Sequence, residues 1–297
     1  MSAWVTQSRC AMSTINESSS TVHHGLWLVA TPIGNLDDIS PRSVSVLRAS
    51  PIVCCEDTRR SGSLLKHIGA RPERLLVTNE HTEHDVIATV LEYLANNITV
   101  SLISDAGTPG ISDPGEQLVA AVHAAGHKVY ATPGPAAFVM AAAISGLPTT
   151  RIAFDGFLPR AGAARRERLT EIARERRTTV LYEAPHRLER TLVDLASTCD
   201  PTRTIVLARE LTKLHEDLWR GTLEDALVHV RTIEPRGEYA IVIAPYQADV
   251  VEVTDTDIID ELTQRIQSGL TTRDAINEVT DALGVPRKRV YTLAVAL

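Results

Sequence analysis

The sequence predicts an α/β fold made of two α/β domains with a cleft between them, followed by a small C-terminal helical segment. Short runs of β-branched and aliphatic residues alternate with helical patterns along the chain. Glycine and proline residues mark the turns between these runs, as is typical of proteins whose sheets are largely parallel. A length of 297 residues is enough for two such domains of roughly 100 to 200 residues each.

The composition is that of a folded, mildly acidic protein. Hydrophobic residues make up 44% of the chain, and the net charge of −7 excludes a histone-like or wholly basic nucleic-acid coat. Aromatic residues are scarce at 4%, so we expect no base-stacking platform, and any RNA contact would be mainly to phosphates and shape. The uncharged stretch 129–150 has the length of a membrane span, but its three prolines indicate a strand, a loop and a buried helix instead.

The N-terminus and the cysteines bear on the cellular compartment. Residues 1–24 are polar and rich in serine and threonine, without the apolar core of a signal peptide. We expect a disordered leader and a cytoplasmic protein, with Met12 as an alternative start. The cysteines form no CxxC pair, and Cys54 and Cys55 would point to opposite faces of a strand. We therefore expect Cys10, Cys54, Cys55 and Cys199 to be inert thiols.

The first domain is predicted over residues 25–147. Its expected strands are the apolar runs at 26–30, 52–55, 75–78, 98–103 and 129–131. A helix is expected over 116–125, where Leu118, Val122 and Ala125 share one face that should pack on the sheet.

The second domain is predicted over residues 148–250 and the helical module over 251–297. The second domain should have strands at 179–182, 204–208 and 238–244 and a helix at 187–196, with the link between domains near 146–155. The module should contain helices at 258–267 and 273–283 and a last helix after Gly284. It resembles a small helix-turn-helix unit, or equally a cap on the second domain.

Three loops rich in glycine and proline follow predicted strands, at residues 31–38, 104–115 and 132–135. Because ligands settle at the carboxyl ends of strands in open α/β sheets, we expect these loops to meet at one cleft. Their backbone amides and turns suit a small polar cofactor. The Gly-rich signatures of dinucleotide folds and P-loops are missing from the sequence, which favours neither of those classes. Taken singly, each loop also fits ordinary turn chemistry.

A set of motifs in these loops and beyond carries a family resemblance. The motifs are TPIGNLDD (31–38), EDTR (56–59), SDAGTP (104–109), SDPG (112–115), PGP (133–135), YE with HR (182–183 and 186–187) and ARELTK (208–213). Together they resemble the ribosomal RNA small subunit methyltransferase I family, which is similar in fold to the tetrapyrrole methylases. The resemblance covers about residues 26–297.

The resemblance implies two domains of tetrapyrrole-methylase type that bind S-adenosyl-L-methionine in the cleft, usually as a homodimer. The implied reaction is 2′-O-methylation of a cytidine ribose in the decoding region of 16S rRNA, either as naked RNA or in the assembled small ribosomal subunit. For the cofactor pocket we expect one set of loop residues: Pro32, Gly34, Asp105, Ala106, Gly107, Pro133 and Gly134. Asp105 is the expected acceptor of hydrogen bonds from the cofactor's ammonium or ribose, and a turn-stabilising role is its alternative.

Methyl transfer from a sulfonium to oxygen is an in-line displacement that needs alignment and a proton acceptor. Glu56 and His81 follow predicted strands and are the first candidates for the base. Glu210 and Lys213 would position the nucleotide from the second domain, unless they form only a solvated salt-bridge face. Helix capping is the alternative for the neighbouring Asp57. No metal is expected, because no third ligand lies within reach of the histidine pair that His81 forms with the nearby His84.

A basic segment suggests where RNA would bind. Seven arginines against three glutamates give residues 160–177 a local charge of +4 in a chain of −7. The expected RNA contacts are Arg59, Arg160, Arg165, Arg166 and Arg187. The alternative is a solvated helix with internal ion pairs.

Two other functions stay open at this point. One is a tetrapyrrole C-methyltransferase of the same fold, although its usual Gly-rich first loop is replaced here by residues 31–35. The other is a ribosome-binding relative without catalysis, anchored by the C-terminal helices and by residues 287–289.

Overall fold

The computed structural model describes residues 22–79, 82–247 and 253–297, which form two compact units that divide between Tyr246 and Gln247. The expected leader lies outside the described residues up to position 21, together with Cys10 and Met12. His81 also lies outside them. Within these ranges, no helix has both the length and the apolar character that a membrane crossing needs.

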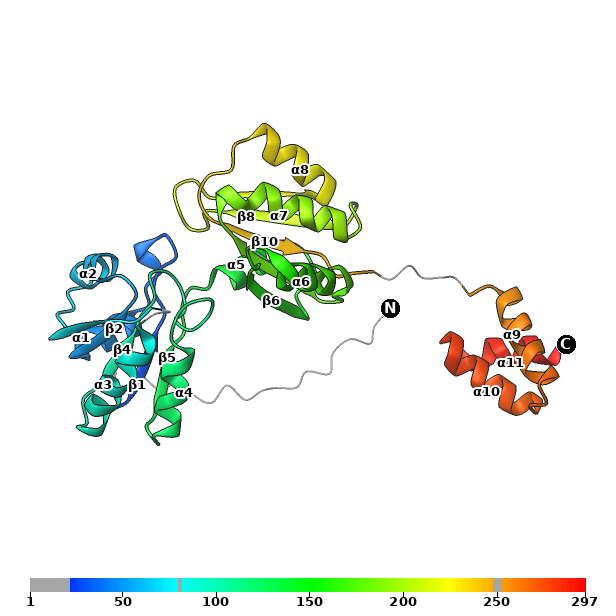
Figure 1. The fold of residues 1–297 in the computed structure, drawn as a ribbon, viewed down its shortest axis with the longest axis horizontal. Coiled ribbons are helices and arrows are strands. Elements are labelled where there is room, and N and C mark those ends of the chain that lie inside the picture. The colour runs from blue at the N-terminus through cyan, green and yellow to red at the C-terminus, as the bar shows by residue number, and fades with distance from the viewer. Residues whose placement is uncertain (1–21, 80–81, 248–252) are drawn as a thin grey trace, which may run out of the picture. The chain divides into compact units, whose positions relative to one another are not determined.

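The first sheet is parallel throughout, in the order β3-β2-β4-β1-β5. Figure 1 shows this sheet with helices α1 to α4 around it. Its strands are β1 (Leu26–Val29), β2 (Ile52–Cys55), β3 (Arg74–Val77), β4 (Val100–Leu102) and β5 (Val129–Thr132). Its helices are α1 (Pro41–Ala49), α2 (Thr58–His67), α3 (Glu83–Ala95) and α4 (Glu116–Ala124), with a 3₁₀ turn, η1, at Leu36–Asp38. The strands match the predicted apolar runs to within two residues at either end.

Two apolar layers enclose this sheet. One face packs with α3 and α4 around Leu26, Cys54 and Leu102, and the other packs with α1 and α2 around Trp27 and Cys55. Adjacent strand residues therefore point to opposite faces, which confirms the prediction for Cys54 and Cys55. Burial raises the pKa of the Cys54 thiol to about 12, which keeps it protonated and unreactive.

The second sheet has the order β6-β7-β10-β8-β9 and is mixed: only β6 and β7 run parallel. Its strands are β6 (Ile152–Phe157), β7 (Thr178–Glu183), β8 (Thr204–Arg209), β9 (Asp217–Thr222) and β10 (Tyr239–Ile243). Helices α6 (Gly162–Arg174), α7 (Pro185–Thr198) and α8 (Leu223–Thr232) pack on one face. Helix α5 (Ala137–Ile144) packs on the other, around Ala141 and Ala142.

The structure corrects two predictions in this half and adds one strand. Part of the expected link at 146–155 is strand β6, whose bulge between Phe154 and Gly156 interrupts the strand pattern. Strand β9 was not predicted, because it is a polar edge strand without an apolar run. The predicted buried helix in 129–150 is only partly buried. Val139, Met140 and Ile144 of α5 are more than 40% exposed.

The second unit consists of α9 (Asp255–Gln267), α10 (Thr272–Leu283) and α11 (Arg287–Val295). These helices share a core of their own, with Ile258, Leu262 and Val279 fully buried. Helix α10 ends at Gly284, which adopts the left-handed conformation (φ 61°) that favours glycine at this position. The three helices agree with the prediction, and the first begins three residues earlier than expected because Thr254 and Asp257 form a capping box.

Candidate functional site

The three Gly/Pro-rich loops meet, as predicted. Thr31 and Gly107 exchange backbone hydrogen bonds of 2.8 and 3.1 Å, which joins the first loop to the second. The Thr108 hydroxyl donates to the carbonyl of Pro135 at 3.0 Å, which joins the second loop to the third. These contacts hold the carboxyl ends of β1, β4 and β5 in one fixed arrangement.

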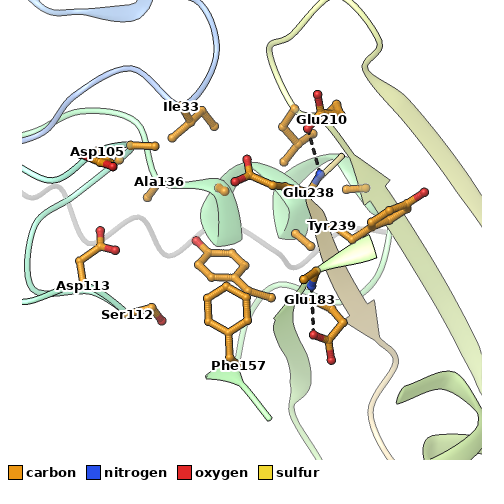
Figure 2. A pocket seen from close by; sticks show the side chains of 18 of the residues that line it. Ile33, Asp105, Ser112, Asp113, Ala136, Phe157, Glu183, Glu210, Glu238 and Tyr239 are labelled. Atoms are coloured by element: carbon orange, nitrogen blue, oxygen red, sulfur yellow. Dashed lines mark hydrogen bonds between the residues drawn. The ribbon is translucent and has the colours of Figure 1, made fainter. Parts of the chain in front are cut away.

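A cavity of about 540 Å³ opens beside these loops (Figure 2). From the first half of the unit it is lined by Ile33, Glu56, Arg60, Asp105 to Thr108, and Ile111 to Asp113. From the second half it is lined by Phe157, Tyr182 to His186, Ala208, Glu210, Leu211, Lys213 and Glu238 to Ala240. The start of α5, at Ala136 and Ala137, lies between the two groups. The volume lies within the range of small-molecule sites in proteins.

Only part of the expected cofactor set lines this cavity. Asp105 and its two successors do, whereas Pro32, Gly34, Pro133 and Gly134 are not among the residues that line it. At Gly134 a Cβ atom would stand 2.6 Å from the Cβ of Ala30, and at Gly34 it would stand 2.8 Å from Oγ1 of Thr212. These two glycines allow the first and third loops to pack closely against their neighbours, although the glycines themselves do not line the cavity.

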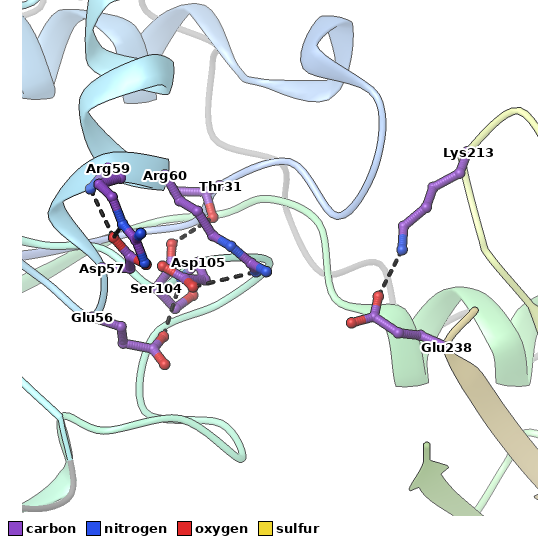
Figure 3. A network of polar contacts seen from close by, with 9 residues as sticks. All are labelled: Thr31, Glu56, Asp57, Arg59, Arg60, Ser104, Asp105, Lys213 and Glu238. Carbon is purple, nitrogen blue, oxygen red and sulfur yellow. Dashed lines mark hydrogen bonds and ion pairs between the residues drawn. The ribbon is translucent and has the colours of Figure 1, made fainter. Parts of the chain in front are cut away.

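Three carboxylates from two loops share the first-half wall of the cavity: Glu56 after β2, and Asp105 and Asp113 after β4. The backbone N–H of Asp105 donates to Oε1 of Glu56 at 3.0 Å, and Arg60 forms an ion pair with Oδ2 of Asp105 at 3.4 Å (Figure 3). The other oxygen, Oδ1 of Asp105, is buried and has no hydrogen-bond partner. This wall therefore offers an unused acceptor and an excess of negative charge.

The electrostatics of the wall differ between its carboxylates. Burial, and after it the charge of Asp105, raise the pKa of Glu56, while the backbone hydrogen bond from Asp105 and the charge of Arg60 act in the opposite direction. Burial, with added repulsion from Glu56 and Asp105, raises the pKa of Asp113 to about 7, against a weaker hydrogen bond from Ser104. Sequence reasoning did not single out Asp113. The SDPG motif marked its position, but Glu56, the charged neighbour with the larger effect, comes from another loop.

The opposite wall carries Lys213 between two carboxylates. Its Nζ donates to Oε1 of Glu210 at 2.8 Å and to Oε2 of Glu238 at 2.7 Å. Although partial burial opposes the charge, these hydrogen bonds raise the pKa of Lys213. Glu210 and Thr212 adopt positive φ angles of 50° and 66°, which are uncommon outside glycine and indicate a tightly held loop. Of the four expected catalytic residues, the structure brings Glu56, Glu210 and Lys213 to the cavity.

Aromatic and buried polar groups complete the second-half wall. The Tyr182 hydroxyl accepts a hydrogen bond from the N–H of Phe138 at 3.0 Å, and Tyr182 meets the half-exposed ring of Phe157 edge to face. The buried Glu183 accepts from the hydroxyl of Thr191 at 2.6 Å and pairs with Arg187 at 3.3 Å. Sequence reasoning placed Glu183 in a motif but did not predict this anchoring role.

The expected RNA contacts fall into different environments. Arg160 and Arg166 are exposed, whereas Arg187 is half-buried and also donates to the carbonyl of Leu158. Arg59 is exposed and pairs with Asp57, whose carboxylate also caps α2, the alternative named for Asp57.

Arg165 is a correction to the predicted RNA contacts. Its side chain is buried and donates to Asp194 at 2.7 Å, to Thr191 at 3.0 Å and to the carbonyl of Pro159 at 3.0 Å. A guanidinium with its donors used in this way joins α6 to α7 and has no exposed surface for a phosphate.

The described part of the chain contains no cluster of three or more His, Cys, Asp or Glu side chains arranged to hold a metal ion. Among the residues that line the first-half wall, Arg60 is the one basic side chain beside the three carboxylates.

Comparison with known proteins gives consistent results. The family model described as Tetrapyrrole (Corrin/Porphyrin) Methylases matches residues 25–227. A protein of Synechocystis sp. named ribosomal RNA small subunit methyltransferase I is 41% identical over 92% of this chain and 98% of its own length. A protein of the same name from Mycobacterium tuberculosis is 39% identical over 90% of this chain and 93% of its own.

Two solved structures are similar in fold. A cobalt precorrin-4 methyltransferase has a TM-score of 0.56 at 18% identity and covers 74% of this chain and 94% of its own. Uroporphyrin-III C-methyltransferase of Thermus thermophilus, complexed with S-adenyl homocysteine, has a TM-score of 0.54 at 18% identity and covers 77% of this chain and all of its own. At such low identity these likenesses concern the fold alone.

Proposed function

The chain belongs to the family of ribosomal RNA small subunit methyltransferase I, and on that premise we propose that it transfers a methyl group from S-adenosyl-L-methionine to ribosomal RNA of the small subunit. The acceptor atom in this proposal is the 2′-oxygen of a cytidine ribose in the decoding region of 16S rRNA. The observation that carries the proposal is the cavity itself: the carboxylates Glu56, Asp105 and Asp113 line its first-half wall, and the buried Oδ1 of Asp105 has no hydrogen-bond partner.

The residues present fit a cationic methyl donor. When bound, S-adenosylmethionine supplies a methyl group on a positively charged sulfonium. Oδ1 of Asp105 can accept a hydrogen bond from an ammonium or hydroxyl group without giving up an existing partner. Ala106 and Gly107 add backbone to the same wall, while the first and third loops hold it in place through Thr31 and Pro135. A buried, unpaired carboxylate oxygen is costly unless a donor satisfies it, so the wall favours such a ligand.

The opposite wall suits the nucleotide. Lys213 and its partner Glu210 lie on a tightly held loop across the cavity from Asp105, where they can orient a ribose (Figures 2 and 3). Holding the acceptor in line with the donor is the largest contribution such a site can make to methyl transfer. Glu56 accepts the backbone N–H of Asp105 and so holds Asp105 in position on the first-half wall.

RNA binding in this proposal uses the exposed arginines near α6. Arg160 and Arg166 are exposed near the start of this helix, and Arg59 is exposed at the start of α2. The proposal also includes a homodimer in the cytoplasm, and the test of the dimer is the mass of the protein in solution.

The walls of the cavity count against the tetrapyrrole alternative. Six carboxylate side chains line it: Glu56, Asp105, Asp113, Glu183, Glu210 and Glu238. A porphyrin-type acceptor carries many carboxylates of its own and would meet repulsion there. The non-catalytic alternative predicts that S-adenosylmethionine gives no heat of binding in calorimetry.

The decisive experiment is transfer of a labelled methyl group onto small ribosomal subunits that lack the modification, followed by mass mapping of the product nucleoside. Naked 16S rRNA is the parallel substrate. We expect a ribose-methylated cytidine. A product methylated on the base would overturn the acceptor assignment, and a tetrapyrrole accepted in place of RNA would overturn the substrate class.

A further inference from the structure

Asp113 is a cavity carboxylate whose position is fixed by its neighbours in the chain. Gly115 has a φ of 135°, and Pro114 restricts the backbone between them. Ser112, with a φ of 59°, lies against the bulge of β6: a Cβ at Gly156 would stand 2.7 Å from Oγ of Ser112. The bulge in the second sheet thus makes room for the loop of the first, and Asp113 points into the cavity (Figure 2).

The groups facing Asp113 leave its charge without a cation. Glu56 after β2 and Asp105 after β4 repel it, while the nearby hydroxyl of Ser104, which donates to the carbonyl of Gly107, acts to lower its pKa. From the second sheet, Tyr182 on β7 is close enough for Asp113 to affect its titration. Arg60 is engaged with Asp105 instead. In the portion of the chain that the structure describes, no ion pair to Asp113 is formed.

Each of the other two carboxylates of this wall has a competing engagement. Oε1 of Glu56 accepts the backbone N–H of Asp105, so a proton there would disturb the loop. Asp105 is paired with Arg60 through one oxygen, and its other oxygen is buried without a hydrogen-bond partner. Asp113 has neither engagement, and it lies toward Tyr182 and the second-half wall, where the nucleotide would be held.

We propose that the carboxylate of Asp113 accepts the proton of the acceptor hydroxyl during methyl transfer. This inference rests on the proposed function. As the oxygen–methyl bond forms from the electron pair of the breaking O–H bond, the carbon–sulfur bond breaks and its electron pair stays on sulfur. The proton passes to Asp113, so the negative carboxylate and the positive sulfonium are neutralised in the same step.

The protonation behaviour of Asp113 suits that role. Burial and the two neighbouring charges raise its pKa to about 7, so that near neutral pH a large fraction is ionised and able to accept a proton. A base with a pKa near the working pH gives the best compromise between being ionised and being strong enough.

The test is Asp113→Asn, compared with wild type in single-turnover methylation of small subunits that lack the modification. We expect the rate to fall by about 10²- to 10⁴-fold, with the affinity for S-adenosylmethionine in calorimetry little changed. The wild-type rate should rise with pH to a plateau above about pH 7, and the variant should lose this dependence.

Asp155→Asn is the matched control. Burial also raises the pKa of Asp155, but this residue on β6 pairs with Arg168 and does not line the cavity. We expect the control to keep the wild-type rate and pH profile.

Two results would overturn the inference. One is a wild-type rate in Asp113→Asn, with or without weakened donor binding, and the other is the absence of a carboxyl that titrates near neutral pH in ¹³C NMR of aspartate-labelled protein. The NMR signal should be present in wild type and lost in the variant, which keeps the test valid if the variant folds poorly. A base-methylated product from wild type would overturn the assignment of a ribose hydroxyl as the acceptor. The NMR signal and the rate of Asp113→Asn would then still show whether Asp113 is the proton acceptor.

Discussion

Asp113→Asn should make the protein more stable, and more so at high pH. The pKa of Asp113 moves from an ordinary value of 3.8 to about 7 in the folded chain. The unfolded chain therefore loses this proton near pH 4 and the folded chain near pH 7. Between these values the folded state binds more protons, so stability falls as pH rises and is level above pH 7. An asparagine cannot ionise and avoids this loss.

The size of the gain in stability follows from the shift in the pKa of Asp113. A fully buried group would contribute about 4 kcal/mol, because each pKa unit corresponds to about 1.4 kcal/mol. Asp113 is only partly buried, and solvent screening reduces the expected gain to about 1–2 kcal/mol at pH 8. Roughly a third of the effect should have developed at pH 5. In calorimetric unfolding this corresponds to a rise in Tm of about 2–8 °C at pH 8 and clearly less at pH 5.

Asp225→Asn is a control of opposite sign. Hydrogen bonds from the hydroxyl and N–H of Thr222 lower the pKa of Asp225, so its contribution is complete above pH 4. This variant should lose the same stability at pH 5 and at pH 8. If Asp113→Asn is less stable than wild type at pH 8, or if its gain is the same at both pH values, the cavity does not hold the unfavourable charge described above.

Three further predictions concern packing and RNA binding. Gly134→Ala places a Cβ against Ala30 at a cost of about 1–3 kcal/mol and should weaken donor binding in calorimetry, whereas Gly62→Ala, in open space on α2, should gain about 0.5–1 kcal/mol and bind normally. Reversing Arg160 and Arg166 to glutamate should lower the salt slope of RNA binding by about two, and an unchanged slope would exclude that surface. Arg165→Ala should instead lower the unfolding temperature, because Asp194 loses its buried donor; an unaltered Tm would contradict the scaffold role.

The central strands of the first sheet, β1, β2 and β4, could be predicted from the sequence because they are buried on both faces. Such strands consist of uninterrupted apolar residues, and residues 52–55 were predicted with the bounds that β2 has. The second sheet was harder because its edges do not follow this rule. Strand β9 carries polar and exposed residues, and β6 is bent by its bulge at Gly156. Both edges are shaped by their neighbours, about which local sequence says little.

The basic segment contained a signal that sequence reasoning could have used. Arg165, Leu169 and Ile172 are spaced at i, i+4 and i+7, so they share one face of α6, and all three are buried. An arginine in register with two aliphatic residues is therefore a candidate for a buried ion pair. Arg166, one position away, lies on the exposed face. Helical register separates the structural arginine from the one available to a phosphate, which the local charge sum cannot do.

The charge state of the cavity could not be predicted, because Glu56 lies far from Asp105 and Asp113 in the chain. Glu56 follows β2, and the other two carboxylates lie in the loop after β4, where an isolated carboxylate would be ionised and solvated. Only the parallel sheet brings these two loops together, and only then do burial and the repulsion from Glu56 act on Asp113. One arginine does not balance the charge of three carboxylates, so either a bound cation or a proton reduces the repulsion between them. Methyl transfer from a sulfonium needs both in turn: the cationic donor balances the wall before the reaction, and the proton balances it afterwards.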